Sequence, residues 1–281
     1  MRKILLALLI FGLLVLPCEA KTPWTSKPPI GAQIDWSHPL SRGLVGCWLM
    51  NEKCGSISNN LVNAYFGNGV ITGATWGSSI KGSKLLFSGT NIVNCGNKII
   101  PNMTNQTWLA MVYPTTIDAT NRRVMVIDDT TPATNRTALT VTNTVVANGI
   151  RIAITATGTN SDSIANAVNL NAWNLIGFTW KGRDISQVNI YSNGKNVTAS
   201  VPGSATAWND SAGGFRIGNR QDAAAPLLGS IAFCYLYNRV LSPSEIQQLY
   251  QEPYCFIKPT TDWDMIKAAV VGGVRRIFLI Q

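Results

Sequence analysis

The sequence predicts an all-β protein, either a two-sheet sandwich or a barrel, that ends in one short helix. About 11 to 13 short segments have the β-branched, aromatic or alternating composition of strands. Asn193-Gly194 stands between two such segments and is a strong hairpin signal, because both residues tolerate positive φ angles. Only one segment, after residue 241, has the start signals of a helix. The strand–helix repeats of α/β proteins are therefore not predicted.

The predicted strands differ in their expected burial. Residues 44–49 form a continuous apolar run bounded by turn residues, which is typical of a fully buried strand. Residues 149–155 carry isoleucine at every second position, which predicts a strand with one face in the core. The other predicted strands are residues 84–87, 91–95, 106–113, 123–127, 138–142, 173–180, 187–192, 196–201, 215–218 and 231–237. The tryptophans of these strands are expected in the core: Trp48, Trp108, Trp173 and Trp180.

The helix after the last strand is predicted from local signals. Ser242 is suited to cap the first free backbone N–H groups, and Glu245 three residues later completes a capping box. Pro243 fits the first helical position, where no donor is lost. Apolar residues then recur at spacings of three and four, which predicts one face packed on the sheets. Pro253 prevents continuation of the helix.

Residues 1–20 are predicted to be a secretory signal peptide. Two basic residues precede an apolar run at residues 4–16, and small residues stand where cleavage after Ala20 would occur. The run is shorter than the about 20 residues that cross a membrane, so no span is predicted after cleavage. Lipidation of Cys18 is the alternative. We expect a secreted, extracytoplasmic protein or, alternatively, one associated with a virion or a cell surface.

The rest of the chain divides by composition into three parts. Residues 21–42 are Pro-rich and polar and predict an extended lead-in, whereas residues 43–252 hold the predicted strands and the helix. Residues 253–281 form a tail in which two apolar runs flank Gly272-Gly273, which favours a terminal hairpin. Because an exposed apolar hairpin is unusual, the tail is expected either to dock on a partner, including a second copy of the chain, or to complete the protein's own core.

The net charge of +9 at pH 7 comes from scarce acidic residues rather than from basic clusters. Beyond residue 20, adjacent basic residues occur only at Arg122-Arg123 and Arg275-Arg276, so nucleic-acid binding is not predicted. A basic surface still favours acidic glycans or membrane surfaces. The six cysteines form no C-x-x-C pair and His38 is the only histidine, so no zinc site is predicted. Loss of Cys18 with the signal would leave an odd number of cysteines.

Several segments resemble one family in the same order along the chain. They are "GLVGCWLMNE" (43–52), "TWLAMVYP" (107–114), "WNLIGFTWKG" (173–182), "VNIYSNGKNV" (188–197), "FRIGN" (215–219) and the closing "GSIAFCYLYNRVLSPSEI" (229–246). Over about residues 40–251 the chain resembles laminin-G-like, concanavalin A-like lectin-glucanase jelly-roll domains, of a phage-like or environmental type. The resemblance implies two antiparallel sheets packed face to face, with the first and last strands as neighbours.

The resemblance also implies features from which this sequence partly departs. Neighbouring first and last strands would bring Cys47 and Cys234 close enough for a disulfide. Part of the family binds calcium, but Ala232 and Phe233 replace acids of the family's closing strand, and Asn60 replaces an acid of a family loop. Because calcium needs several carboxylate or carbonyl oxygens together, calcium binding is disfavoured, and no cofactor or metal site is predicted.

Glycoside hydrolases share this general fold and are the alternative that the acidic residues test. Such enzymes need two carboxylates that flank the scissile bond. Asp128 and Asp129 are adjacent, so in a strand they point to opposite faces, and Glu245 is assigned to the helix cap. The sequence has no E-x-D-x-E strand and no Gly-x-Ser-x-Gly motif. We therefore predict that the protein is not an enzyme.

Two loop segments combine aromatic, amide and charged groups, as sugar recognition requires. The candidate ligand contacts in them are Trp208, Asn209, Asp210, Arg220 and Asp222. An ordinary solvated loop is the alternative for each segment. The sequence predicts a secreted, non-catalytic module that binds a glycan or a protein surface. The alternatives are a structural or adhesion protein of a virion or cell surface, which contacts its partner through residues 259–281, and a glycoside hydrolase.

Overall fold

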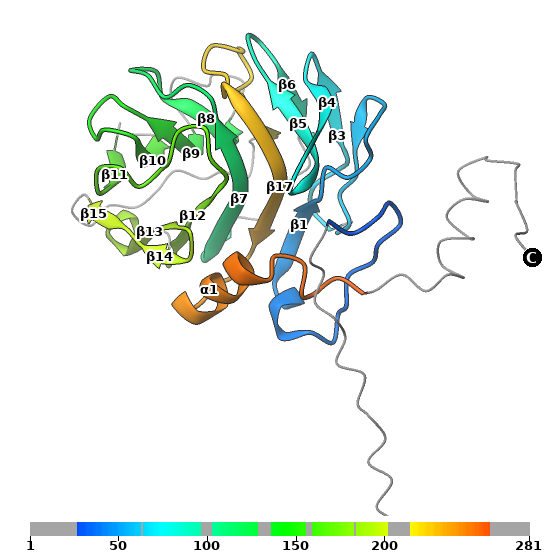
Figure 1. The fold of residues 1–281 in the computed structure, drawn as a ribbon. Coiled ribbons are helices and arrows are strands. Elements are labelled where there is room, and N and C mark those ends of the chain that lie inside the picture. Colours follow the sequence, from blue (N-terminus) through cyan, green and yellow to red (C-terminus); the bar gives the residue numbers. More distant parts are fainter. Residues whose placement is uncertain are drawn as a thin grey trace, which may run out of the picture.

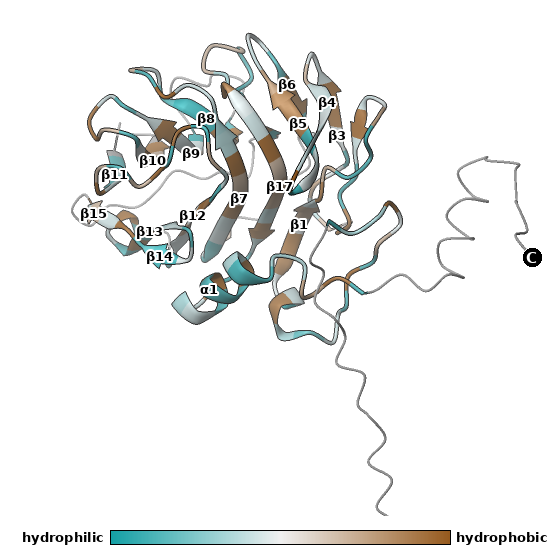
Figure 2. Cartoon of the chain, viewed as in Figure 1, coloured by the Kyte–Doolittle hydropathy of each residue, from teal (hydrophilic) through white to brown (hydrophobic). Residues whose placement is uncertain are grey.

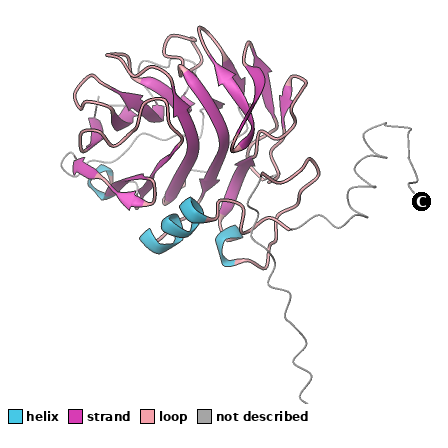
Figure 3. Cartoon of the chain, in the orientation of Figure 1, coloured by secondary structure: helices cyan, strands magenta, loops and turns pink. Residues whose placement is uncertain are grey.

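The computed structural model describes residues 27–62, 64–96, 103–128, 136–155, 159–182, 184–201 and 214–258. Within them the chain forms two antiparallel sheets and one α-helix, α1 (Pro243–Gln251) (Figure 1). Two short 3-10 helices, η1 (Pro39–Ser41) and η2 (Ile185–Gln187), lie in connections. Strands are the main regular secondary structure of the described fold (Figure 3). The predicted all-β jelly-roll sandwich with one short C-terminal helix is confirmed. The predicted signal peptide and terminal hairpin lie outside the described residues.

The first sheet has eight strands, in the order β14-β13-β12-β7-β17-β5-β4, with β1 paired to β17 off this path. Its strands are β1 (Leu44–Trp48), β4 (Thr75–Ser79), β5 (Gly82–Phe87), β7 (Gln106–Pro114), β12 (Asn174–Trp180), β13 (Val188–Ser192), β14 (Lys195–Asn196) and β17 (Gly229–Tyr237). Because β1 and β17 are neighbours, the first and last strands of the described chain meet, as the resemblance implied.

The second sheet has nine strands, in the order β15-β11-β10-β9-β8-β16-β6-β3-β2. Its strands are β2 (Ile57–Ser58), β3 (Gly69–Thr72), β6 (Ile92–Asn94), β8 (Arg122–Asp128), β9 (Arg136–Thr142), β10 (Gly149–Thr155), β11 (Thr159–Ser163), β15 (Thr198–Ser200) and β16 (Gly214–Ile217). The predicted strand at residues 196–201 is in fact divided, because β14 pairs with β13 in the first sheet and β15 pairs with β11 in the second.

The space between the sheets is filled by a large apolar cluster with aromatic rings at its centre. Phe215 stacks on Trp48, with ring centroids 4.9 Å apart, and meets the edge of Trp108 at 5.8 Å. Apolar residues run along β1 and β17 (Figure 2). The predicted core positions of Trp48, Trp108 and Trp180 are confirmed. Trp173 instead lies half-buried on the outer face of the first sheet, because it precedes β12 and shares a side with Leu175.

A second apolar cluster lies on the outer face of the first sheet. Phe233 and Tyr235 of β17 stack with ring centroids 4.5 Å apart, and Phe256 meets Tyr235 edge-on at 5.2 Å. Residues of the lead-in and of α1 complete the cluster. The lead-in also pairs with the segment after α1, since Asp35 donates its backbone N–H to the carbonyl of Phe256 at 2.8 Å. Both ends of the described chain therefore help to cover this sheet.

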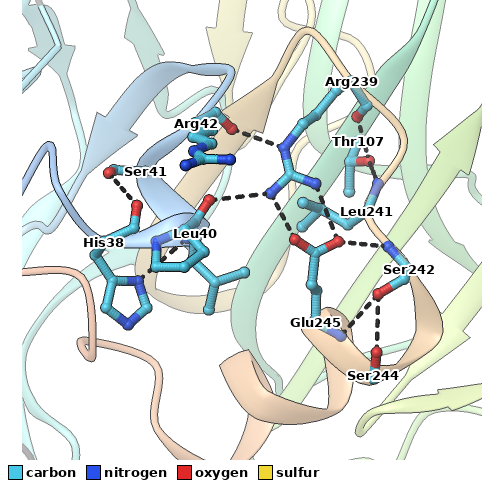
Figure 4. A network of polar contacts seen from close by, with 11 residues as sticks. His38, Leu40, Ser41, Arg42, Thr107, Arg239, Leu241, Ser242, Ser244 and Glu245 are labelled. Atoms are coloured by element: carbon cyan, nitrogen blue, oxygen red, sulfur yellow. Dashed lines mark hydrogen bonds and ion pairs between the residues drawn. The ribbon is translucent and has the colours of Figure 1, made fainter.

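Polar contacts fix the junction between β17 and α1 (Figure 4). Ser242 Oγ accepts the backbone N–H of Glu245 at 3.2 Å, and the Glu245 carboxylate accepts the backbone N–H of Ser242 at 2.8 Å, so the predicted capping box is confirmed. Arg239 donates to both oxygens of Glu245, at 2.7 and 3.0 Å, and to the carbonyl of Arg42 at 2.7 Å. Glu245 is thus held as a structural residue between the helix and the lead-in.

The predicted disulfide between Cys47 and Cys234 is wrong, since both residues are free thiols. The strands are neighbours, but the register pairs Cys234 with Trp48 and Cys47 with Tyr235. Successive strand residues point to opposite faces of a sheet. Cys234 therefore lies in the core between the sheets, and Cys47 lies in the second cluster.

Candidate functional site

The outer face of the second sheet carries a set of charged side chains. In β10, Ile150, Ile152 and Ile154 belong to the core, so the alternation turns Arg151 and Ala153 outward. The same alternation in β8, β9, β11 and β16 turns other charged residues to this side. We define the arginine face by six residues: Arg123, Asp128, Arg136, Arg151, Asp162 and Arg216.

Strand register places these residues beside one another. One row crosses β11, β10, β9 and β8 and consists of Asp162, Arg151, Thr140 and Arg123. Asp128 of β8 is the cross-strand partner of Arg136 of β9. Directly opposed residues in antiparallel strands have Cβ atoms about 4.5–5.5 Å apart. The sheet backbone therefore sets the spacing of the charged groups.

A small apolar floor separates the charged residues of this face. It consists of Val126, Ala138 and Ala153, each at most 3% exposed. Arg216 is the cross-strand partner of Val126. The short side chains of the floor leave room for the long arginine side chains, whose apolar stems can lie along such surfaces.

Two aspartates of the face are held by arginines. Arg151 donates from Nε and Nη2 to the two oxygens of Asp162, at 2.8 and 3.1 Å, which is the strong two-point geometry. Arg216 forms an ion pair with Asp128, and both side chains are almost completely buried. The backbone N–H of Gln221 donates to the same carboxylate at 3.0 Å. Burial raises the pKa of Asp128, although Gln221 and Arg216 act in the opposite direction.

Arg123 differs from these paired residues. It is 3% exposed, and within the described part of the chain its Nε and Nη1 atoms are buried without a hydrogen-bond partner. Burial, followed by the like charges of Arg136 and Arg220, lowers the pKa of Arg123 to about 9, against the opposing effect of Asp128. The face therefore contains a buried cation with unused donors.

The loop after β16 brings two predicted ligand contacts beside this face. Asn219 Oδ1 accepts the backbone N–H groups of Arg220 and Ala225, at 2.9 and 3.1 Å, and so shapes the loop. Arg123 donates its backbone N–H to the carbonyl of Ala225 at 3.0 Å, which ties the loop to β8. Arg220 Nε donates to Asp222 at 2.5 Å, and both side chains are partly exposed.

The structure groups arginines that the sequence did not single out as candidate ligand contacts. Trp208, Asn209 and Asp210 lie outside the described residues, so their predicted role stays a prediction. Arg123 appears in the sequence only as half of a basic pair, and Arg216 only inside a strand motif. Alternation within each strand indicates that such residues face outward, but their grouping depends on which strands are neighbours.

The arginine face presents donors rather than free carboxylates. Among the described residues, no three His, Cys, Asp or Glu side chains gather closely enough to hold a metal ion. Glu52 lies apart from this face, in the loop after β1, where its Oε1 accepts the backbone N–H of Asn59 at 2.6 Å. Burial raises the pKa of Glu52, against the hydrogen bonds from Asn59 and the charge of Lys27.

A cleft with a volume of about 560 Å³ lies between the lead-in and the first sheet. Lys27, Pro28 and Asn51 are among its lining residues. Lys27 Nζ donates to the carbonyls of Met50 and Ala232, at 3.2 and 2.5 Å, and to that of Ser83. These contacts tie the lead-in to β17 and β5, so the lysine acts as an anchor.

A smaller cleft, about 300 Å³ in volume, lies on the outer face of the first sheet. Lys84 and Tyr113 line it, and Lys84 Nζ lies 5.6 Å from the centre of the Tyr113 ring and 5.9 Å from that of Trp173. The two rings meet edge-on with centroids 5.5 Å apart. Because the lysine already lies against both rings, they do not form an open stacking platform.

Solved structures with the same fold include domains of carbohydrate-active enzymes. Domain 4 of an extracellular arabinanase from Geobacillus stearothermophilus, solved with arabinotriose, matches with a TM-score of 0.55 at 16% identity, over 74% of this chain and 98% of that one. A mutant sialidase of Trypanosoma rangeli matches with a TM-score of 0.56 at 16% identity, over 77% of this chain. The match spans only 34% of the sialidase chain. At these identities the likeness shows the fold alone.

Three further findings concern the described helices, curated sequences and the protein family. None of the described helices is long and apolar enough to cross a membrane. A search of curated proteins found no matching sequence. A family model described as the concanavalin A-like lectin/glucanases superfamily matches residues 87–247, which is more than half of the chain. This protein therefore belongs to the concanavalin A-like lectin/glucanase superfamily.

Proposed function

We propose that this protein is a non-catalytic module that binds glycans through its arginine face and acts outside the cytoplasm. The observation that carries the proposal is the row from Asp162 to Arg123, where guanidinium groups are spaced by strand register and Arg151 is locked by a two-point ion pair. Rigid strands position binding groups better than loops do. The arabinanase domain of the same fold, solved with arabinotriose, supports a saccharide as the class of ligand.

The non-catalytic part of the proposal rests on the carboxylates of the face. Hydrolysis of a glycosidic bond needs one carboxyl group that delivers a proton and a second that acts as nucleophile or base. Among the described residues of the face, Asp128 and Asp162 each have an arginine partner. Asp128 is completely buried, and both oxygens of Asp162 are bound by Arg151, so neither carboxyl group is presented to a glycosidic oxygen.

The test is a glycan array probed with the purified full chain and with an Arg151→Gln variant. Loss of the guanidinium removes a cationic group from the row and leaves Asp162 as an unpaired carboxylate, so binding should fall by about tenfold or more. Arg42→Gln is the matched control, because Arg42 is exposed and lies beside η1 rather than on the second sheet. The proposal fails if no glycan binds, or if Arg151→Gln binds as tightly as the control.

Hydrolysis of a polysaccharide panel tests the non-catalytic part separately. We expect no release of reducing sugar. Activity that disappears in Asp128→Asn or Glu52→Gln would make the protein a glycoside hydrolase.

The alternative function, an adhesion or virion protein, depends on residues 259–281, which lie outside the described residues. Its test is deletion of that tail, and loss of self-association or of particle association would support it.

A further inference from the structure

We infer that the arginine face recognises an anionic group, the carboxylate or sulfate of an acidic saccharide, and that Arg123 is its anchor. This inference rests on the proposed function and names the ligand chemistry of the same site. Its starting point is the pair of Arg123 donors, Nε and Nη1, that are buried without a partner among the described residues. Most buried polar side-chain atoms have a hydrogen-bond partner, so a buried guanidinium with two unpartnered donors calls for an ion, a water or a ligand beside it.

The charges around Arg123 favour an anion over a neutral ligand. With the loop included, the described residues of the site are five arginines, Arg123, Arg136, Arg151, Arg216 and Arg220, and three aspartates, Asp128, Asp162 and Asp222. Each aspartate forms an ion pair with an arginine other than Arg123. None of these described aspartates therefore pairs with Arg123, and an anion beside Arg123 would offset the like charges of Arg136 and Arg220.

The shape of the donor group favours an oxyanion. A guanidinium is planar and presents its donors in a fixed fork that matches the oxygens of carboxylate and sulfate groups. A neutral sugar hydroxyl could accept one of these donors but would leave the buried charge unbalanced. Arg136, Arg151 and Arg220 are half-buried, so the surroundings of Arg123 extend from the interior towards solvent.

The experiment compares saccharides that differ only in charge. Isothermal titration of the full chain uses oligogalacturonate against its methyl ester, and a sulfated carrageenan oligosaccharide against its desulfated form. At least one charged member should bind about tenfold or more tightly than its neutral partner. The arm with the larger preference identifies the group as carboxylate or sulfate. Arg123→Gln should abolish the preference, Arg123→Lys should keep part of it, and Arg42→Gln should keep all of it.

Thermal melting gives a readout that does not depend on variants. The charged oligosaccharide should raise the Tm of the unaltered chain, and the neutral partner at the same concentration should raise it less. Equal binding of charged and neutral partners would overturn the inference and leave glycan binding standing. Arg123→Gln with an unchanged preference would also overturn it. A chain that binds no saccharide, charged or neutral, would refute both the inference and the proposed function.

Discussion

Arg123 and Arg216 are both buried on the same face of the second sheet, but only Arg216 has an ion-pair partner among the described residues. We therefore expect the two arginines to affect the free energy of unfolding differently. Both side chains are 3% exposed. Arg216 has Asp128 as an ion-pair partner and Gln221 as an acceptor at 2.6 Å. Arg123 has two buried donors without described partners. Burial of a charge destabilises a fold unless partners offset the lost hydration.

Replacement of these two arginines by methionine should therefore give contrasting results. Arg216→Met leaves Asp128 as a buried charge without its partner and should lower the free energy of unfolding by about 3–5 kcal/mol. Arg123→Met removes an unpaired buried charge and should leave this free energy unchanged or raise it by about 1 kcal/mol. Urea unfolding of both variants measures the difference. Equal losses in the two variants would show that Arg123 has a structural partner.

The buried carboxyl group of Glu52 predicts a pH effect. Its Oε2 is buried without a described partner, and burial raises the pKa of Glu52 above its usual value. A carboxyl group whose pKa is raised by folding stabilises the fold below the unfolded pKa of about 4.3, and this contribution is lost as pH rises through the folded pKa. Glu52 is thus a cost to stability at pH 7, which lies above its unfolded pKa.

Glu52→Gln should accordingly be more stable than the unaltered chain at pH 7, by about 1 kcal/mol. At pH 4 the advantage should shrink, because Glu52 is then protonated and neutral in the unaltered chain. Paired urea titrations at the two pH values check this sign. A variant that is less stable at pH 7 would mean that the attraction between Glu52 and Lys27 outweighs the cost of burial.

At the scale of elements, α1 shows how completely local signals can specify a structure. Its cap, its first-turn proline and its buried Ile246 and Leu249 all lie within nine residues of one another. The strands were predictable where apolar alternation is strong. The strand β11 was not, because Thr159–Ser163 reads TNSDS and contains no large apolar residue. It is held by backbone pairing to β10 and by the ion pair between Asp162 and Arg151.

The capping box gives the prediction that belongs to this scale. Ser242→Ala removes the acceptor for the backbone N–H of Glu245 and should lower the free energy of unfolding by about 1 kcal/mol. Gln248→Ala, at an exposed position of the same helix, is the control and should change stability by less than about 0.5 kcal/mol. Urea unfolding of both variants distinguishes them. A Ser242→Ala variant as stable as the control would show that packing alone holds the helix.

At the scale of the whole molecule, the features that the sequence could not predict are those that depend on strand register. The residues of the arginine row are separated by more than ten positions in the chain and meet only because four strands pair in one particular order. The same limit explains why the disulfide prediction was wrong. The strands were correctly predicted to be neighbours, but a one-residue offset in register puts Cys47 and Cys234 on opposite faces of the sheet. Local chemistry could suggest Arg220 and Asp222, but not the buried arginine beside them.

The second apolar cluster joins segments from both ends of the described chain. The family match covers residues 87–247, whereas Leu40 of the lead-in and Phe256 after α1 lie outside it and are fully buried in this cluster. The sequence predicted an extended lead-in and a tail that either docks on a partner or completes the protein's own core. In the structure the backbones of the two segments bond to each other over the first sheet, as from Asp35 to Phe256. They therefore stabilise the sandwich itself.

Phe256→Ala tests this role. Phe256 is 0% exposed and packs edge-on against Tyr235 of β17, so its truncation should lower the free energy of unfolding by about 3–5 kcal/mol. Ile80→Ala, at a residue that is 93% exposed, should change it by less than about 0.5 kcal/mol. Urea unfolding measures both. If Phe256→Ala were as stable as Ile80→Ala, the segment after α1 would be an appendage. A large loss of stability would instead show that the folding unit extends beyond the family match at both ends, because Phe256 packs with the lead-in in one shared apolar cluster.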